Sequence, residues 1–235
     1  MNYFRYDDAC GAYSVYATAD GFKSNYGFLD KTGEGFKSYN IRPSQMAPVI
    51  FVNDKGQTVL EEMKWGLIPS WWKEDPKISY KLFNARDDKV FTSGMWRSVY
   101  RKRALVPASG YYEWTKPPKG EEKQKYYYTL KQQELFSFAG FYDVWKDAGD
   151  RDWKTYTIIT TEPNKEASKV HNRMPVILHK EDEQAWIDPT KTKRDEIEPF
   201  IHPLEDGGLK VVEVGNNTNA FKYDDEGLIK ALNSK

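Results

Sequence analysis

Alternating apolar and polar side chains predict β-strands along most of this chain. The longest alternation runs from Arg103 to Trp114, where the odd-numbered residues from Leu105 to Glu113 share one face. The even-numbered residues from Val106 to Trp114 share the other face, so the sequence predicts one continuous strand. Because Tyr111 neighbours Glu113 on its face, a single carboxyl group is expected among bulky aromatic side chains.

Shorter patterns predict the remaining elements. Strands are expected at 13–17, 155–161 and 209–214, with an apolar strand after the polar loop at 170–175 and hairpins pairing 48–53 with 57–63 and 126–131 with 135–142. Short helices are expected at 182–187, 194–201, 226–232 and within 86–101, with loops or turns at 21–37, 39–45 and 65–72. This mixed order predicts the α+β class and not a doubly wound parallel sheet. At 235 residues without a linker-like segment, a single domain is expected.

Three side chains with reactive groups leave open choices. A buried Glu113 needs a partner or a raised pKa, and a carboxyl that titrates near neutral pH suits general acid or base catalysis. The alternative is a carboxylate facing water on an edge strand. His171 is expected at a loop-strand junction, either titrating near neutral pH or held as a structural histidine. Cys10 is most simply a small buried apolar residue.

Charge and aromatic content suggest a ligand class. Aromatic residues form 15% of the chain and include eight Trp, while the net charge is zero. The segment Lys64–Arg103 nevertheless has ten Lys and Arg against four Asp and Glu, a net charge of +6, interleaved with Trp, Tyr and Phe. Cations for phosphates and rings for unstacked bases are typical of single-stranded nucleic acid binding. The alternative is a solvated charged face over an aromatic core.

Other functional classes are disfavoured. No apolar run approaches the roughly 18 residues of a membrane-spanning helix, and the polar, acidic N-terminus does not resemble a secretion signal. A single cysteine forms no internal disulfide, so we expect an intracellular, cytoplasmic protein. One Cys and three His without ligand spacing predict no metal site, and no cofactor is implied. The zero net charge and the absence of heptads do not favour a coiled coil, and a monomer is expected.

Taken together, several motifs resemble the SOS-response-associated peptidase (SRAP) family. In family order, the matching stretches are Cys10-Gly11-x-Tyr13, Asn40-Ile41-x-Pro43-Ser44-Gln45, Trp65-Gly66-Leu67-Ile68-Pro69-Ser70-Trp71, Asn84-Ala85-Arg86, Trp96-Arg97, Arg103 through Trp114, Thr160-Thr161 and His171-x-Arg173-Met174-Pro175. Each is weak alone, but their joint occurrence over nearly the whole chain is highly specific.

The resemblance implies a β-rich domain that recognises abasic sites in single-stranded DNA, and therefore a protein that associates with the nucleoid when bound to DNA. In the family an N-terminal cysteine reacts through its amine and thiol with the aldehyde of the opened abasic sugar, which closes a thiazolidine crosslink. The implied catalytic residues are Cys10 and three others: Asn84 to hold the amine and sugar, Glu113 to shuttle protons and His171 to protonate the ring oxygen or assist reversal. The positions implied against DNA or lining the site are Pro43, Trp71, Arg86, Arg97 and Thr160.

Two departures from the family pattern matter. Ala12 replaces a common arginine, which puts one phosphate contact in question. More seriously, nine residues precede Cys10, so its nitrogen is an amide that cannot form a Schiff base. Residues 1–9 are either a propeptide removed at Ala9-Cys10 with help from Glu113 and His171, or an extension ahead of the true start. In the third alternative, Asn2 fills the terminal position and the protein binds DNA without a crosslink. We favour the propeptide, with residues 10–235 as the mature domain.

Two other functions remain as alternatives. The first is a single-stranded DNA-binding module that forms no crosslink and in which Cys10 is structural. The second is a thiol peptidase acting in trans, since Cys, His, Asn and Glu are the residue types of a cysteine hydrolase.

Overall fold

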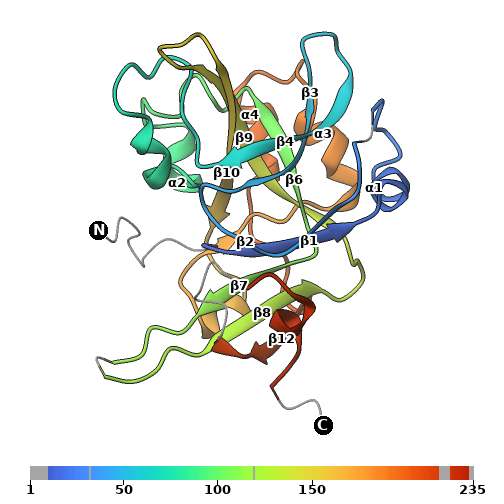
Figure 1. Cartoon of the computed structure of the whole chain (residues 1–235), viewed down its shortest axis with the longest axis vertical. Coiled ribbons are helices and arrows are strands. Elements are labelled where there is room, and N and C mark those ends of the chain that lie inside the picture. Colours follow the sequence, from blue (N-terminus) through green and yellow to red (C-terminus); the bar gives the residue numbers. More distant parts are fainter. Residues whose placement is uncertain (1–9, 32, 119, 217–222, 233–235) are drawn as a thin grey trace.

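The computed structural model describes residues 10–31, 33–118, 120–216 and 223–232. They form two β-sheets with short helices at the periphery, which confirms the β-rich α+β class (Figure 1). One sheet has five strands in the order β12-β8-β7-β1-β2. Its strands are β1 (Tyr13–Ala17), β2 (Phe36–Ile41), β7 (Gly110–Trp114), β8 (Lys125–Leu130) and β12 (Leu209–Val214).

The other sheet closes into a five-stranded barrel because β10 pairs with both β4 and β9. The barrel strands are β3 (Met46–Val52), β4 (Thr58–Trp65), β6 (Arg103–Ala108), β9 (Phe136–Lys146) and β10 (Asp152–Thr161). Neighbours in the barrel are antiparallel except β4 and β10, which are parallel. Two short strands also pair with β10. The strand β5 (Asn84–Arg86) runs parallel to it, and β11 (Met174–Pro175) runs antiparallel to it. Figure 1 places the barrel above the five-stranded sheet.

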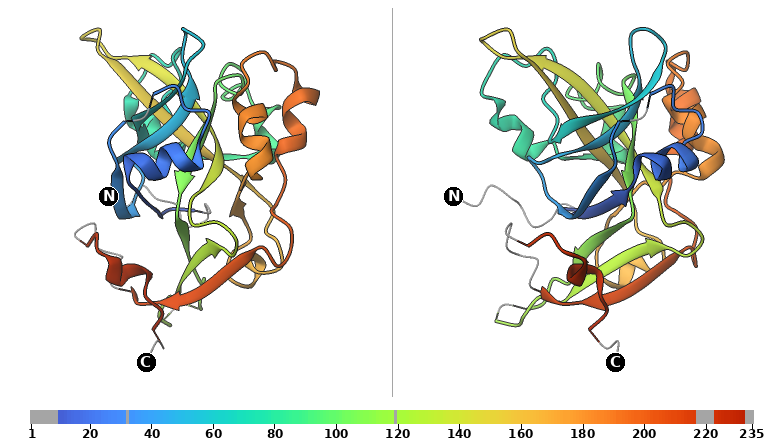
Figure 2. Two further views of the ribbon diagram at one scale, coloured as in Figure 1. Left: turned by 90° about the vertical axis from the view of Figure 1, so that its right-hand side faces the viewer. Right: turned by 45° about the vertical axis from the view of Figure 1, so that its right-hand side comes forward.

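The helices are short and lie outside the sheets, as the rotated views show (Figure 2). They are α1 (Ala19–Asn25), α2 (Asp87–Val90), α3 (Glu183–Ile187) and α4 (Arg194–Ile197), with 3₁₀ turns at Pro76–Lys81, Ala167–Lys169, Lys180–Asp182, Glu198–Phe200 and Glu226–Ile229. The hydroxyl of Thr18 accepts a hydrogen bond from Gly21 N at 3.0 Å, which caps the start of α1. No described helix is long and apolar enough to cross a membrane.

The predicted hairpin at 48–63 is confirmed by β3 and β4. Its turn is built by Asn53, whose Oδ1 accepts hydrogen bonds from the backbone N–H groups of Lys55 and Gln57, each at 3.0 Å. Gly56 closes the turn at φ +71°, a backbone angle that other residues adopt at a cost. The strands expected at 13–17, 155–161 and 209–214 are also confirmed.

A cluster of aromatic rings joins the two sheets. Tyr13 on β1 packs edge-on against Trp65 and Phe138 of the barrel, with ring centroids 5.1 and 5.8 Å away. Its hydroxyl lies 2.6 Å from the hydroxyl of Tyr156 on β10, and all four side chains are fully buried. Since β1 begins three residues after Cys10, this cluster fixes the position of Cys10 against the barrel.

The prediction of one continuous strand over Arg103–Trp114 was wrong. Residues 103–108 form β6 of the barrel and residues 110–114 form β7 of the other sheet, with Ser109 between them. At the crossing, Ser109 N donates to Ser14 O at 2.7 Å. Alternation continues through the crossing because the backbone stays extended while its partner strands change, so the pattern does not reveal the switch.

Three further expectations were wrong. Segments 126–131 and 135–142 belong to β8 and β9, which lie in different sheets and do not form a hairpin. Tyr39–Ile41 is the end of β2 and not part of a polar turn, and the expected closing helix at 226–232 is a 3₁₀ turn over Glu226–Ile229. In each case the local sequence pattern does not show which distant segment the residues pack against. Strand pairing in this fold mostly joins segments that are far apart in the sequence.

The close packing where the chain crosses from β6 to β7 predicts that a substitution at Gly110 lowers stability. A Cβ atom on Gly110 would lie 2.3 Å from the ring of Tyr127, a buried side chain whose hydroxyl is bonded to Ser14 at 2.7 Å. Gly110→Ala is therefore expected to lower the free energy of unfolding by about 1–3 kcal/mol, because the ring must leave its place. Urea denaturation measures this, with Gly27→Ala as the control, since nothing lies within 4 Å of a Cβ there. Equal losses of unfolding free energy in Gly110→Ala and Gly27→Ala would contradict the close packing of Tyr127 on Gly110.

Candidate active site

Cys10 and Glu113 are brought together by the pairing of β1 with β7. Tyr13 pairs with Tyr111, and Tyr112 N donates to Ala12 O at 3.0 Å. This pairing places the backbone nitrogen of Cys10 2.6 Å from Oε1 of Glu113, to which it donates a hydrogen bond. The two residues are 103 positions apart in sequence, and both side chains are buried.

Burial controls the proton affinity of both groups. It raises the pKa of the Glu113 carboxyl to about 8, although the hydrogen bond from Cys10 N and the charge of Lys116 act in the opposite direction. Burial, together with the charge of Glu113, also raises the pKa of the Cys10 thiol well above its usual value. At neutral pH Glu113 can therefore give or accept a proton, whereas Cys10 is held mostly as the protonated thiol.

Cys10 also has an unusual backbone. Its φ is +55°, in the left-handed region that non-glycine residues seldom adopt. Such a conformation persists only where the surroundings enforce it. Here it accompanies the hydrogen bond from the Cys10 nitrogen to the buried Glu113 carboxyl.

Asn84, Arg86 and Thr160 lie together on β5 and β10. Asn84 pairs with Ile158, and Arg86 pairs with Thr160 in the parallel ladder. Asn84 is half-buried and Thr160 is buried. Arg86 is exposed and its guanidinium donates to Asp88 at 3.0 and 3.2 Å.

His171 lies beside an open hollow of about 530 Å³, which is also lined by Lys116, Pro163, Ser168, Val170 and Asn172. Its Nδ1 accepts a hydrogen bond from Arg173 N at 3.2 Å. Lys116 lines this hollow, and its charge also acts to lower the pKa of the Glu113 carboxyl. Of the predicted catalytic residues, Cys10 and Glu113 are thus in direct contact, while His171 lines the hollow and Asn84 lies on β5 beside β10.

Arg173 belongs to the His171 motif but was not expected to have a role of its own. Its guanidinium contacts Asp87 Oδ1 at 2.6 Å and also donates to the carbonyl of Thr160. Asp87 Oδ2 in turn accepts a hydrogen bond from the Thr161 hydroxyl at 2.8 Å. This network ties the loop that carries His171 to the end of β10 and to the start of α2, which directly follows the strand that carries Asn84.

Asp87→Ala is expected to lower the free energy of unfolding by about 2 kcal/mol, because it leaves the mostly buried Arg173 guanidinium without its carboxylate. Asp88→Ala is the matched control. It breaks an ion pair whose side chains are about half exposed, which contributes less than about 1 kcal/mol. Chemical denaturation of both variants tests this, and a larger loss in Asp88→Ala would contradict it.

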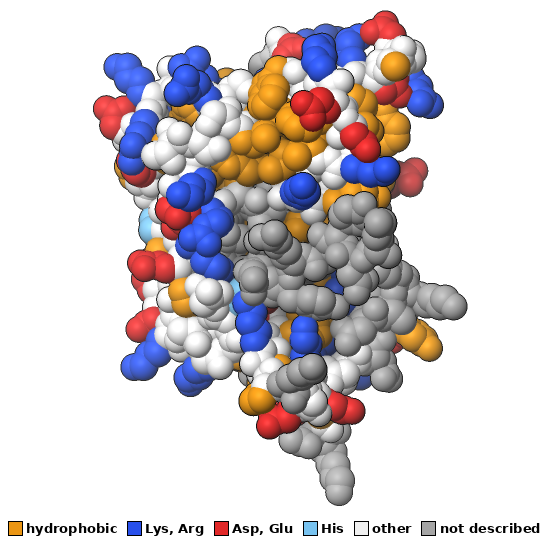
Figure 3. Space-filling model, turned by 90° about the vertical axis from the view of Figure 1, so that its left-hand side faces the viewer, with side chains coloured by type: hydrophobic (Ala, Val, Ile, Leu, Met, Phe, Trp, Pro, Cys, Tyr) orange, Lys and Arg blue, Asp and Glu red, His pale blue; other side chains and the backbone are white. Residues whose placement is uncertain are grey.

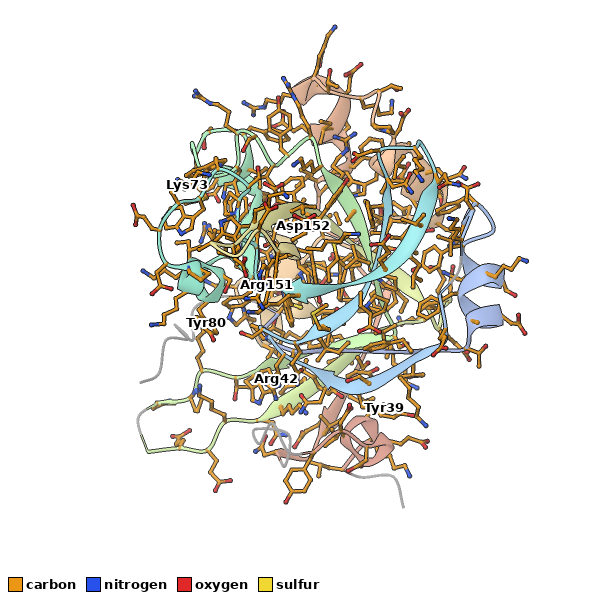
Figure 4. The ribbon with its side chains drawn as sticks, turned by 45° about the horizontal axis from the view of Figure 1, so that its top comes forward. Tyr39, Arg42, Lys73, Tyr80, Arg151 and Asp152 are labelled. Atoms are coloured by element: carbon orange, nitrogen blue, oxygen red, sulfur yellow. The ribbon has the colours of Figure 1, made fainter. Side chains whose placement is uncertain are left out.

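Only part of the basic segment Lys64–Arg103 is exposed on the surface of the molecule. Arg103 is buried and donates to the carbonyls of Trp186, Asp188 and Lys191, and the rings of Trp65, Phe83 and Trp96 are in the core. The exposed cations, here called the basic surface, are Lys73, Lys77, Lys81, Arg86, Lys89, Arg97 and Arg101. Figure 3 shows Lys and Arg side chains spread over the face that carries this segment, and Figure 4 places Lys73 and Tyr80 along one edge.

The residues expected against DNA differ in exposure. Trp71 is 44% exposed, donates its Nε1–H to Ser98 at 3.0 Å and packs on Trp72, so an accessible ring lies within the basic surface. Arg86 and Arg97 are also exposed, whereas Pro43 and Thr160 are buried. DNA contacts by these five residues stay predictions. Among the described residues, no group of three or more His, Cys, Asp or Glu is placed to hold a metal ion.

Comparisons with known proteins identify the family. The model of the SOS response associated peptidase (SRAP) family matches residues 9–221. "Abasic site processing protein YoqW" of Bacillus subtilis is 34% identical over 227 residues, which cover 94% of this chain and 99% of that protein. "Abasic site processing protein HMCES" of Xenopus tropicalis is 33% identical over 198 residues, covering 72% of this chain and 58% of that protein.

Solved structures agree with these sequence matches. A crystal structure of a protein from Bacteroides thetaiotaomicron superimposes with a TM-score of 0.80 at 27% identity, covering 94% of this chain and 99% of that one. The family model and the YoqW match each span most of the chain. The chain therefore belongs to the SOS response associated peptidase (SRAP) family.

Proposed function

We propose that this protein processes abasic sites in single-stranded DNA by forming a covalent crosslink through Cys10, after it has removed its own residues 1–9. The observation that carries the proposal is the 2.6 Å contact between Cys10 N and the Glu113 carboxyl. Both proposed reactions take place at that nitrogen, and a carboxyl whose pKa is about 8 can give or accept its proton. The names of the relatives supply the substrate.

The first reaction frees the amine. The Cys10 sulfur attacks the carbonyl carbon of Ala9, the C–N bond between Ala9 and Cys10 breaks, and the nitrogen leaves with a proton from Glu113. A thioester remains, and one water hydrolyses it to release residues 1–9 and restore the thiol. Because the thiol is buried and its pKa is raised, this step is slow unless the thiol first loses its proton.

The second reaction makes the crosslink. The freed amine adds to the aldehyde of the opened abasic sugar and loses one water to give an imine, and the Cys10 thiolate then bonds to the imine carbon. The nitrogen takes up a proton, which leaves a five-membered thiazolidine. Glu113 exchanges protons at the nitrogen, His171 protonates the sugar ring oxygen to open it, and Asn84 holds the sugar.

The basic surface holds the DNA in this proposal. Exposed Lys and Arg bind phosphates, and the accessible ring of Trp71 stacks on an unpaired base. Binding should therefore weaken as salt concentration rises.

A denaturing gel tests the function directly. The protein is mixed with three single-stranded oligonucleotides that carry an abasic site, an intact base, or a tetrahydrofuran analogue without an aldehyde. We expect a band that survives denaturation only with the true abasic site. The same band with the tetrahydrofuran oligonucleotide would contradict aldehyde chemistry.

One observation favours a second function, DNA binding without a crosslink. The Cys10 thiol is fully buried and its pKa is raised, as expected of a structural cysteine. In that case the oligonucleotides bind at low salt, and no band survives denaturation.

A further inference from the structure

Tyr111 carries a buried hydroxyl group for which the fold provides no partner. The side chain is fully buried, and its oxygen has no hydrogen-bond partner among the described residues. An unsatisfied buried hydroxyl lowers stability, and such groups are rare in folded proteins. A retained group of this kind calls for a ligand, a bound water or a functional role.

The Tyr111 side chain lies on the face of β7 that carries the proposed active site. Tyr111 precedes Glu113 by two residues on β7, so both side chains lie on the same face, and its partner across the ladder is Tyr13. The Glu113 carboxyl reaches the Cys10 nitrogen from this face. Burial raises the pKa of the Tyr111 hydroxyl well above its usual value, and the charges of Glu113, Tyr128 and Cys10 act in the same direction. The group therefore remains a hydrogen-bond donor across the physiological pH range.

The ring is held rigidly, so the hydroxyl cannot turn to another partner. Tyr111 stacks on Tyr128 with centroids 4.8 Å apart and an angle of 13° between the rings, and it meets the edge of Phe138 at 5.9 Å. The Tyr128 hydroxyl is also buried without a partner among the described residues. Tyr128 lies on β8, however, which β7 separates from β1, the strand that follows Cys10.

Neutral donors fit an uncharged oxygen. Tyr111 and Glu113 bring no positive charge to this face, and a desolvated phosphate would require one. A sugar hydroxyl or a carbonyl oxygen accepts a hydrogen bond from a phenol without that requirement. The abasic sugar supplies both kinds of oxygen next to the carbon that reacts.

We infer that the Tyr111 hydroxyl is a further substrate-binding group, which donates a hydrogen bond to an uncharged oxygen of the abasic sugar beside Cys10 and Glu113. This inference rests on the proposed function. It gives a hydrogen-bond partner to a buried hydroxyl that has none among the described residues of the folded protein.

Tyr111→Phe in the full chain tests the inference, because it removes one oxygen and keeps the stacked ring. We expect the maximal rate of crosslinking to abasic single-stranded DNA to fall about tenfold, as for the loss of one hydrogen bond in the transition state. The DNA concentration that gives half the maximal rate should stay unchanged, because the basic surface is intact. The thermal midpoint should stay equal or rise, because no bond of the folded protein is lost.

Tyr128→Phe is the matched control and should crosslink within about twofold of wild type. Four results overturn the inference alone: a wild-type rate for Tyr111→Phe, equal losses of rate in both variants, a change confined to the half-saturating DNA concentration, or a lowered thermal midpoint, which indicates a buried water. If wild type itself forms no adduct, the crosslinking function fails and the inference falls with it.

Discussion

Cys10→Ala is expected to abolish every DNA adduct that survives denaturation, a larger effect than any other single substitution. Alanine has no sulfur to close the ring, and its nitrogen stays in the amide bond to Ala9, where it cannot form an imine. The protein should also stay at its full length, because no thiol attacks the carbonyl of Ala9. Mass spectrometry of the protein and a denaturing gel measure both outcomes.

The substitution should leave the fold and DNA binding intact. Cys10 is a small, fully buried side chain, and the basic surface lies on other segments. Unchanged binding to intact single-stranded DNA is therefore the control. Adduct formation by Cys10→Ala at the wild-type rate would show that another residue supplies the nucleophile.

Glu113→Gln is expected to slow removal of residues 1–9 by about 100-fold or more, as for loss of a general acid. The amide can still accept the hydrogen bond from Cys10 N but cannot deliver a proton. The pH profile gives the sharper test. With the Glu113 pKa at about 8 and the thiol pKa well above its usual value, the wild-type rate should rise with pH as thiolate forms and level off near pH 8.

The levelling reflects two opposing changes above pH 8, where more thiolate forms while less Glu113 keeps its proton. In Glu113→Gln, the rate at which residues 1–9 are removed should therefore start lower and continue to rise through pH 8. The rate of removal, followed by intact mass from pH 6 to 9, measures both profiles. A wild-type profile that rises in parallel with that of Glu113→Gln would contradict the role of Glu113 as the acid.

Local sequence patterns predicted where the strands lie better than they predicted which strands pair with one another. The alternation in 103–114 correctly indicates extended backbone, yet Ser109 marks a change of sheet that leaves no trace in the pattern. Likewise, Trp65 and Trp96 stand among cations in the sequence but are in the core. A solvated basic surface over aromatic packing therefore describes much of this segment.

The candidate site could be predicted only in part. Local sequence places Glu113 among aromatic residues, but nothing local connects it to Cys10, and that connection came from the family resemblance. Their contact depends on β1 lying beside β7. The Arg173–Asp87 pair and the unsatisfied Tyr111 hydroxyl depend on side-chain positions that only the folded chain defines.

The most direct test of the central proposal is the intact mass of the purified full-length protein, before and after mixing with a single-stranded oligonucleotide that carries one abasic site. The proposal predicts a chain that starts at Cys10, and then an adduct whose mass is that of this chain plus the DNA less one water. A mass that keeps residues 1–9, with no adduct although the oligonucleotide still binds, would contradict it and leave DNA binding without a crosslink.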